Sequence, residues 1–482
     1  MATVVARRRV LRAVAGMGGA LAGAAVLGGC GTAGSVTRSK AQPQPSAGAV
    51  RLSFNCNWQG APWNATAVRL VQDYVNTHFN AKQRKIWATV TGSNGQGQAQ
   101  TVIAASIAGT GFPAIVEDCC SDLATYESGK WLLPLNTFLR QDNISTALWN
   151  QGHIQALSLG GNLLALPSYD GPMVMMYRQD ILDQIGLSYP HPNWTYTEAQ
   201  ALWQQCARKA SGGKSRYGAA LEWLPSPEYL FQGWGGTLMD AAHTRCLIDS
   251  PQCVAAGNWF YQQIFSGAAT YRNDVSGLVS GREVFSMCGG WDVLPAAQQL
   301  GSTVKWNILP VPAWPKGFST FTNIDFYGID RAVRHPDAAW QLLRFLCVDP
   351  GFTRFQMQST LVQPALLSLW SEWETVVKQT AVPLKTKHLK YFKEAALSGR
   401  AYPHMFFLNG AVQADQIIAS GASQIASHKV SVSRGFAQIA RQVNAWEKNA
   451  ATAAANAVKI AAAMKKNYPT HGPSVAVVQP GL

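Results

Sequence analysis

The order of short strands and helices in the first part of the sequence restricts the fold more than any other feature. Residues 50–56, 85–90 and 114–117 form short β-rich runs, and the stretches 62–79 and 96–108 between them carry apolar residues at helical spacing. A chain that alternates strand, helix and strand builds a parallel sheet covered by helices on both faces. The sequence therefore predicts an α/β fold.

Polar and aromatic residues follow two of these strands. Trp58 and Gln59 come directly after the first strand, and Glu117 and Asp118 lie at the end of the third. Ligands of parallel sheets bind at the carboxyl ends of the strands, near the point where the strand order reverses. We therefore expect these four residues on one ligand-binding rim.

The rest of the chain is long enough for a second domain. About 430 residues follow the N-terminal region, which is too many for a single core. Strands expected at 163–166 and 173–177 are joined through 167–172, whose two prolines and one glycine indicate a crossing between domains. Further strands are expected at 217–221, 283–287, 305–311 and 324–329, and helices at 195–209, 336–347 and 435–466.

The N-terminus has the layout of an export signal. A cluster of four arginines precedes an Ala/Gly-rich run at 13–27 that is shorter than the roughly 20 apolar residues needed to span a bilayer. The run ends in Leu27-Gly-Gly-Cys30, which resembles the lipobox of bacterial lipoproteins, where the cysteine is acylated; an ordinary signal with a coincidental cysteine is the alternative. We expect a signal peptide at 1–29 and a lipid-anchored flexible tether at 30–49, which together imply a protein at the outer face of the cell membrane. Residues 7–12 resemble a twin-arginine signal, and general secretion stays an alternative route.

Charge and cysteine content limit the partners. The net charge is +14, of which the four signal arginines supply four, leaving +10 on the mature chain. The lysines and arginines are scattered, so no nucleic-acid partner is expected. No C-x-x-C or H-x-x-x-H pattern indicates a metal, and no cofactor is expected. Cys246 and Cys253 bracket a short loop and are candidates for a disulfide in an exported protein.

Catalytic motifs are absent from the sequence. It contains neither G-x-S-x-G nor H-E-x-x-H. The pairs Glu117/Asp118 and Asp292/Asp325 supply the two carboxylates that glycoside hydrolysis requires. A membrane-tethered carbohydrate-active enzyme is therefore an alternative to a binding protein.

Tryptophans at expected turns favour carbohydrate binding. The chain contains 17 Trp, and Trp58, Trp223 and Trp291 each lie in a turn beside a polar residue. An indole covers the C–H face of a sugar ring, while neighbouring amides and carboxylates bind its hydroxyl groups. The alternative is that these indoles are core residues, as tryptophan often is.

A series of motifs, in order, resembles one family. Met287-Cys-Gly-Gly-Trp291 resembles its Met-x-x-Gly-x-Trp motif, and the helix from Pro336 resembles its Pro-Glu-Ala-Ala-Trp helix. The chain is similar over about 50–450 to the extracellular solute-binding proteins of carbohydrate-uptake ABC transporters, the group of maltodextrin-binding protein. The other matching segments lie at 126–135, 166–187, 193–198, 247–251 and 309–312.

The resemblance implies a two-lobed, periplasmic-binding-protein-like clamshell with a central sheet in each lobe. It implies chain crossings near 167–171, 301–305 and 331–335. Lobe one would comprise 50–167 and 305–333, and lobe two 171–304 and 334–470, followed by a tail at 471–482.

The resemblance also implies a function. A monomer would bind a sugar or oligosaccharide between its lobes and deliver it to ABC permease subunits in the membrane. The alternatives are the tethered enzyme and a binder of a non-sugar ligand such as a polyol, sugar phosphate or peptide. The ligand-binding residues expected by position are Trp58, Gln59, Glu117, Asp118, Tyr169, Asp170, Trp223, Trp291 and Asp325.

Overall fold

A computed structural model describes most of the chain from residue 44 onward. The expected signal peptide, Cys30 and the 471–482 tail lie outside the described residues. The described residues are 44–56, 65–79, 85–92, 99–107, 113–119, 122–208, 216–221, 228–271, 275–379, 384, 387–403 and 411–467.

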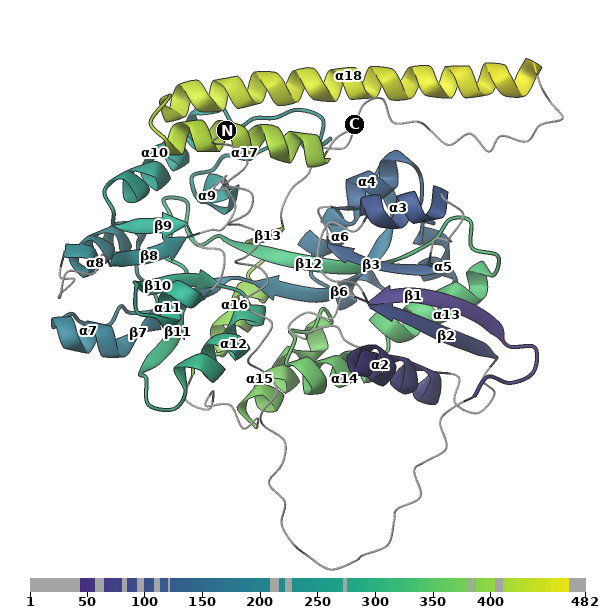
Figure 1. The fold of residues 1–482 in the computed structure, drawn as a ribbon, viewed down its shortest axis with the longest axis horizontal. Coiled ribbons are helices and arrows are strands. Elements are labelled where there is room, and N and C mark those ends of the chain that lie inside the picture. The colour runs from purple at the N-terminus through teal and green to yellow at the C-terminus, as the bar shows by residue number, and fades with distance from the viewer. Residues whose placement is uncertain are drawn as a thin grey trace, which may run out of the picture. The chain divides into compact units, whose positions relative to one another are not determined.

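The first sheet contains the predicted parallel strands. Its order is β13-β12-β3-β1-β2, and β6 also pairs with β12, from Thr322 to Gly328 (Figure 1). Strand β1 is parallel to both β2 and β3, as the strand–helix–strand pattern predicts, whereas β12 is antiparallel to β3 and β6. The strands are β1 Val50–Cys56, β2 Ile86–Gly92, β3 Ile115–Cys119, β6 Ala165–Pro172, β12 Thr320–Ile329 and β13 Ala401–Pro403.

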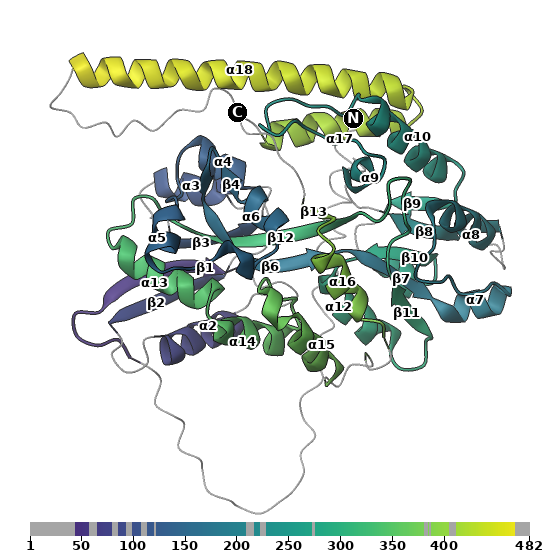
Figure 2. The ribbon, with the colours of Figure 1, turned by 180° about the vertical axis from the view of Figure 1, so that it is seen from behind.

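Helices cover both faces of this sheet. Both ribbon views place α3, α4 and α6 on one side of the strands and α2 and α14 on the other (Figures 1 and 2). On the second side, Tyr74 of α2 stacks on Phe355 of α14 with ring centroids 3.8 Å apart. These helices are α2 Ala65–His78, α3 Ala99–Ile107, α4 Leu123–Ser128, α6 Gln151–Ala156 and α14 Pro350–Thr360.

The second sheet has the order β11-β7-β10-β8-β9. Strand β10 is parallel to β8 and antiparallel to β7. A capping box opens α8, the helix expected at 195–209. The Thr195 backbone N–H donates to Glu198 Oε2 at 2.7 Å, and the Glu198 N–H donates to Thr195 Oγ1 at 3.3 Å. The strands are β7 Val174–Arg178, β8 Tyr217–Leu221, β9 Ala269–Tyr271, β10 Glu283–Cys288 and β11 Trp306–Leu309, with α8 Tyr196–Arg208 and α10 Pro251–Phe265 beside them.

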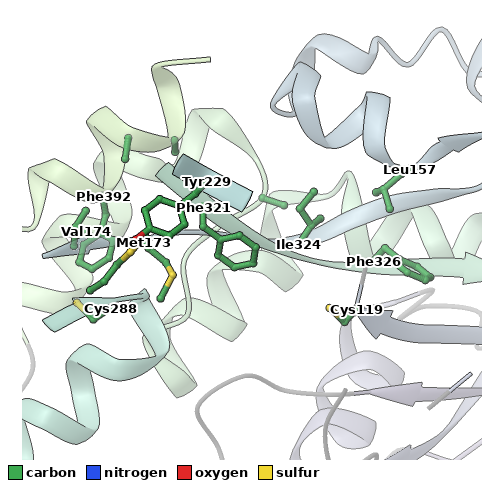
Figure 3. Packing of buried hydrophobic residues seen from close by; sticks show 14 of the residues in the cluster. Cys119, Leu157, Met173, Val174, Tyr229, Cys288, Phe321, Ile324, Phe326 and Phe392 are labelled. Atoms are coloured by element: carbon green, nitrogen blue, oxygen red, sulfur yellow. The ribbon is translucent and has the colours of Figure 1, made fainter. Parts of the chain in front are cut away.

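The chain passes from the first sheet to the second at Met173, which alone separates β6 from β7. Its backbone N–H donates to the Phe321 carbonyl at 2.8 Å, and its carbonyl accepts from Thr320 Oγ1 at 2.8 Å. Apolar side chains line this passage on β12 and β7 (Figure 3). The crossing therefore lies just after the segment 167–171, at which it was predicted, because all of that segment belongs to β6.

Two of the predicted lobe boundaries differ from the observed packing. The range 305–333 was expected in lobe one, but β11 pairs with β7 in the second sheet, so the return crossing lies between 310 and 319 rather than at 301–305. The range 334–470 was expected in lobe two, but α13 packs on β6 and β12 and β13 pairs with β12. Short apolar strands have similar sequence patterns in both sheets, so only their pairing with other strands shows to which sheet each belongs.

The C-terminal helices pack on the second-sheet side. Helices α17 and α18 lie side by side and contact α10 (Figures 1 and 2). The predicted 435–466 helix is confirmed within α18. The remaining elements are α5 Asn136–Gln141, η2 Thr146–Leu148, β4 Ser158–Leu159, β5 Asn162–Leu163, α7 Gln179–Ile185, α9 Glu228–Gly233, α11 Ser276–Val279, α12 Gly290–Leu300, α13 Pro336–Cys347, η3 Leu367–Leu369, α15 Trp370–Lys378, α16 Lys390–Leu397, α17 Ala411–Ala426 and α18 Val432–Asn467.

The predicted disulfide between Cys246 and Cys253 is not formed: both are buried thiols. Cys253 Sγ donates to the Thr237 carbonyl at 3.3 Å, and burial raises the pKa of this thiol to about 11. The backbone N–H of Cys246 donates a hydrogen bond to Asn444 Oδ1 at 2.7 Å.

Among the described residues, no helix is long and apolar enough to cross a membrane.

Candidate ligand-binding site

Strand β12 brings the predicted acidic residues of three strands together. Asp325 is in register with Cys119 of β3 on one side and with Tyr169 of β6 on the other. Pairing with β6 then passes from Tyr169 to Pro167, which leaves Ser168 as the extra residue of a β-bulge. Glu117, Asp118, Tyr169, Asp170 and Asp325 therefore lie within a few residues of one point of the sheet, and all five are buried.

Two of these acids bind to the helical layer formed by α4 and α6. Asp118 Oδ2 accepts a hydrogen bond of 2.9 Å from the Tyr126 hydroxyl of α4. Asp170 Oδ1 accepts one of 2.9 Å from Thr322 Oγ1 and lies 3.2 Å from Nε2 of the buried His153 of α6. The carboxyl groups of both residues are thus engaged inside the lobe, and we infer an internal structural role for both.

Glu117 is held by the bulge. Ser168 Oγ donates to Glu117 Oε1 at 3.0 Å, and the Asn55 side chain binds the Glu117 backbone at both its N–H and its carbonyl. The charge of Glu117 helps raise the pKa of Cys56, after the larger effect of burial. Glu117 is therefore fixed inside the sheet by neighbouring strands.

Tyr169 contacts residues from two further elements. Its ring meets Trp291 at the start of α12 edge to face, with centroids 6.2 Å apart, and its hydroxyl donates to Gln363 Oε1 at 3.1 Å. Gln363 follows α14, and its neighbour Pro364 forms an isolated bridge with Tyr169. Trp291 is partly exposed, whereas Tyr169 and Gln363 are buried.

The charges around Tyr169 are negative. Burial raises its pKa, and the nearby carboxylates of Asp325, Asp170 and Asp292 raise it further. Asp292 also accepts the Gly289 backbone N–H at 3.0 Å and so caps α12. The Tyr169 hydroxyl therefore keeps its proton and acts as a donor.

The sequence profile of the bacterial extracellular solute-binding proteins matches residues 75–369. The chain belongs to this family. The resemblance to extracellular solute-binding proteins that the sequence predicts is thereby confirmed, and the members of this family are binding proteins.

Solved structures confirm the two-lobed α/β fold of solute-binding proteins. The chain is 18% identical to the cyclic alpha-maltosyl-1,6-maltose binding protein of Arthrobacter globiformis, with a TM-score of 0.67 over 83% of this chain and 100% of that one. The sugar-binding protein MalE of Xanthomonas citri is 16% identical, with a TM-score of 0.66 over 88% and 100% of the two chains. UgpB of Mycobacterium tuberculosis, solved with glycerophosphocholine, is 17% identical, with a TM-score of 0.65 over 83% and 98%.

For a solute-binding protein, the group formed by Trp291, Tyr169 and Gln363 has suitable chemistry. It combines an indole face with a hydroxyl and an amide from three separate elements. Gln363 was not predicted, since no local pattern marks a glutamine before a proline in a loop. The predicted residues Trp58, Gln59 and Trp223 lie outside the described residues. Among the described residues, no group of three or more potential ligands could hold a metal ion.

Proposed function

We propose that this solute-binding protein captures a neutral sugar or oligosaccharide and delivers it to the permease of an ABC importer. The observation that carries the proposal is that the partly exposed Trp291 ring meets the ring of Tyr169, on which the carboxylates of Asp325, Asp170 and Asp292 act. An indole stacks on the apolar face of a sugar ring, and carboxylates accept hydrogen bonds from its hydroxyls. Asp325, Trp58, Gln59 and Trp223 belong to this proposed site by the positions that the family resemblance gives them.

The local charge favours a neutral ligand over an anionic one. Among the buried side chains that the structure describes, two are basic. His153 lies against Asp170, and Arg178 binds Asp180 and the backbone carbonyls of Leu278 and Val279. An anion beside Tyr169 would therefore meet three carboxylates without a buried cation to offset them.

The two sheets define the proposed lobes. Lobe one contains the first sheet with α2, α3, α13 and α14, and lobe two contains the second sheet with α8, α10, α17 and α18. A ligand that touches both lobes favours the closed form, because only that form contacts it from both sides. The permease would then recognise the closed, loaded monomer.

We further propose that the chain is exported and held at the membrane through an acylated Cys30. The arginine cluster, the short apolar run and the Leu-Gly-Gly-Cys sequence support this proposal. Replacement of Cys30 by alanine should abolish incorporation of a labelled fatty acid and release the protein from membranes. Retention of both label and membrane binding would contradict the anchor.

A thermal-unfolding screen of the purified protein tests the function. A ligand at a hundredfold its Kd stabilises by about 2.7 kcal/mol, which should raise the Tm by roughly 5–10 °C. We expect such a rise with glucose, maltose, maltotriose or mannotriose, recovery of the sugar intact, and loss of the rise in Trp291→Ala. A shift with glycerophosphocholine or a sugar phosphate alone would refute the neutral-sugar proposal, and recovery of cleaved sugar would favour the enzyme.

A further inference from the structure

Gln363 is a completely buried amide with one half of its hydrogen-bonding capacity used. Its Oε1 accepts from the Tyr169 hydroxyl at 3.1 Å, but its Nε2 has no hydrogen-bond partner among the residues that the structure describes. A buried N–H donor without an acceptor is destabilising. A donor held in this way next to a partly exposed indole is suited to binding an acceptor that arrives with a ligand.

The orientation of the amide is selected by two neighbours. Tyr169 donates its proton to the oxygen, as its raised pKa allows. The same oxygen is the atom that a Cβ on Gly290 would strike, so it packs against the amino end of α12. The partial positive charge of a helix amino end favours an oxygen over an N–H group at this place. The Tyr169 hydroxyl and the amino end of α12 both favour the Gln363 orientation in which Oε1 faces them and Nε2 points away.

We propose that Gln363 is a ligand-binding residue, whose Nε2 donates to a hydroxyl or ring oxygen of a carbohydrate that stacks on Trp291. This inference rests on the proposed function and deepens it. Carboxylates nearby can only accept hydrogen bonds when ionised, whereas a sugar hydroxyl both donates and accepts. Gln363 supplies the donor that the acidic neighbourhood lacks, so it selects ligands with an oxygen at this position.

The test replaces Gln363 by methionine, which keeps the length of the side chain and removes both polar atoms. In the full chain, the gain from losing an unpartnered donor is offset by the loss of the acceptor of the Tyr169 hydroxyl, so the Tm without ligand should change by only a few degrees. The Kd for maltose, maltotriose or mannotriose, whichever the wild type binds, should rise about 10- to 100-fold. The matched control is Gln263→Met on α10, where Gln263 is also completely buried and its Nε2 donates to the Trp259 carbonyl at 3.2 Å. That variant should leave the Kd unchanged.

A second variant keeps the proposal testable if the first fails to fold. The double change Tyr169→Phe with Gln363→Met removes both members of the hydrogen bond, so no hydroxyl is left without its acceptor. Unchanged affinity in a folded Gln363→Met or double variant would overturn the role of Gln363 and leave the proposed function standing. A lower Tm without ligand together with an unchanged Kd would also overturn the ligand-binding role of Gln363, because a purely structural role predicts that combination of results. If the wild type binds none of the four sugars of the thermal-unfolding screen, both proposals fall together, whereas binding of one of them with unchanged affinity in the variants removes the role of Gln363 alone.

Discussion

Asp118 is buried as an acid that holds its proton, and Asp118→Asn should remove a dependence of stability on pH. Its side chain is 1% exposed and accepts hydrogen bonds from the Tyr126 hydroxyl at 2.9 Å and the Cys119 N–H at 2.8 Å. Burial raises its pKa to about 10, and the neighbouring Asp122 adds to the effect. Asparagine has the same shape, and its amide can also serve both contacts.

The sign follows from the two states of the chain. Unfolded Asp118 loses its proton near its ordinary pKa of about 4, whereas the folded group keeps it up to about pH 10. Its full contribution to stability is therefore present below about pH 4 and is lost progressively as the pH rises toward 10. Each unit in this window lowers the free energy of unfolding by about 1.4 kcal/mol. Three units, from pH 5 to 8, give about 4 kcal/mol, a large part of a total of about 5–15 kcal/mol.

Urea denaturation at pH 5, 6, 7 and 8 measures this slope directly. We expect the wild type to lose several kcal/mol over the range, and Asp118→Asn to lose about 4 kcal/mol less. Asp249→Asn, at an exposed aspartate, should follow the wild type. Parallel curves for wild type and Asp118→Asn would refute the assignment of a protonated, buried Asp118. Affinity for carbohydrate should be unchanged in this variant, because the carboxyl binds α4.

Two further predictions concern packing and the thiols. Gly290→Ala should lower the free energy of unfolding by about 1–3 kcal/mol, since its Cβ would overlap the amide of Gln363; Gly152→Ala, where a Cβ meets an ordinary contact, should change it by about 1 kcal/mol or less in urea denaturation. Because none of the described cysteines forms a disulfide, a reducing agent should leave the Tm within about 1 °C. A drop of many degrees in a thermal scan would show that a disulfide forms.

The sequence predicts elements well where periodicity is strong. The first strand was expected at 50–56 and the helix from Pro336 at 336–347, and both agree with the observed bounds. The sheet to which a strand belongs was harder to predict. Strand β11 is buried on both faces, and no pattern within it distinguishes β7 from a neighbour in the first sheet. Only the long-range pairing decides.

The structure brings some of the expected residues together and turns others away from them. Tyr169 and Trp291 were both expected, and the structure brings their rings together. Asp118 and Asp170 were expected beside them, yet Asp118 accepts a hydrogen bond from Tyr126 of α4, and Asp170 accepts one from Thr322 of β12 and lies against His153 of α6. Alternate residues of a strand normally lie on the same face of the sheet. The extra residue Ser168 interrupts this alternation within β6, so residues before and after it no longer follow one pattern. A bulge of this kind has no signature in the sequence.

The net charge of the chain and the charge at the proposed site have opposite signs, and the site is the better guide to the ligand. The sequence carries +14, whereas the groups that act on Tyr169 are the carboxylates of Asp325, Asp170 and Asp292. Exposed charges more than about 10 Å from a ligand are largely screened at ordinary salt, while buried charges are screened much less. The scattered surface lysines and arginines therefore have little influence on binding, and the buried negative charge around Tyr169 disfavours an anionic ligand and so favours a neutral one. In such a site one amide donor, Gln363, is enough to make the position of a ligand oxygen matter.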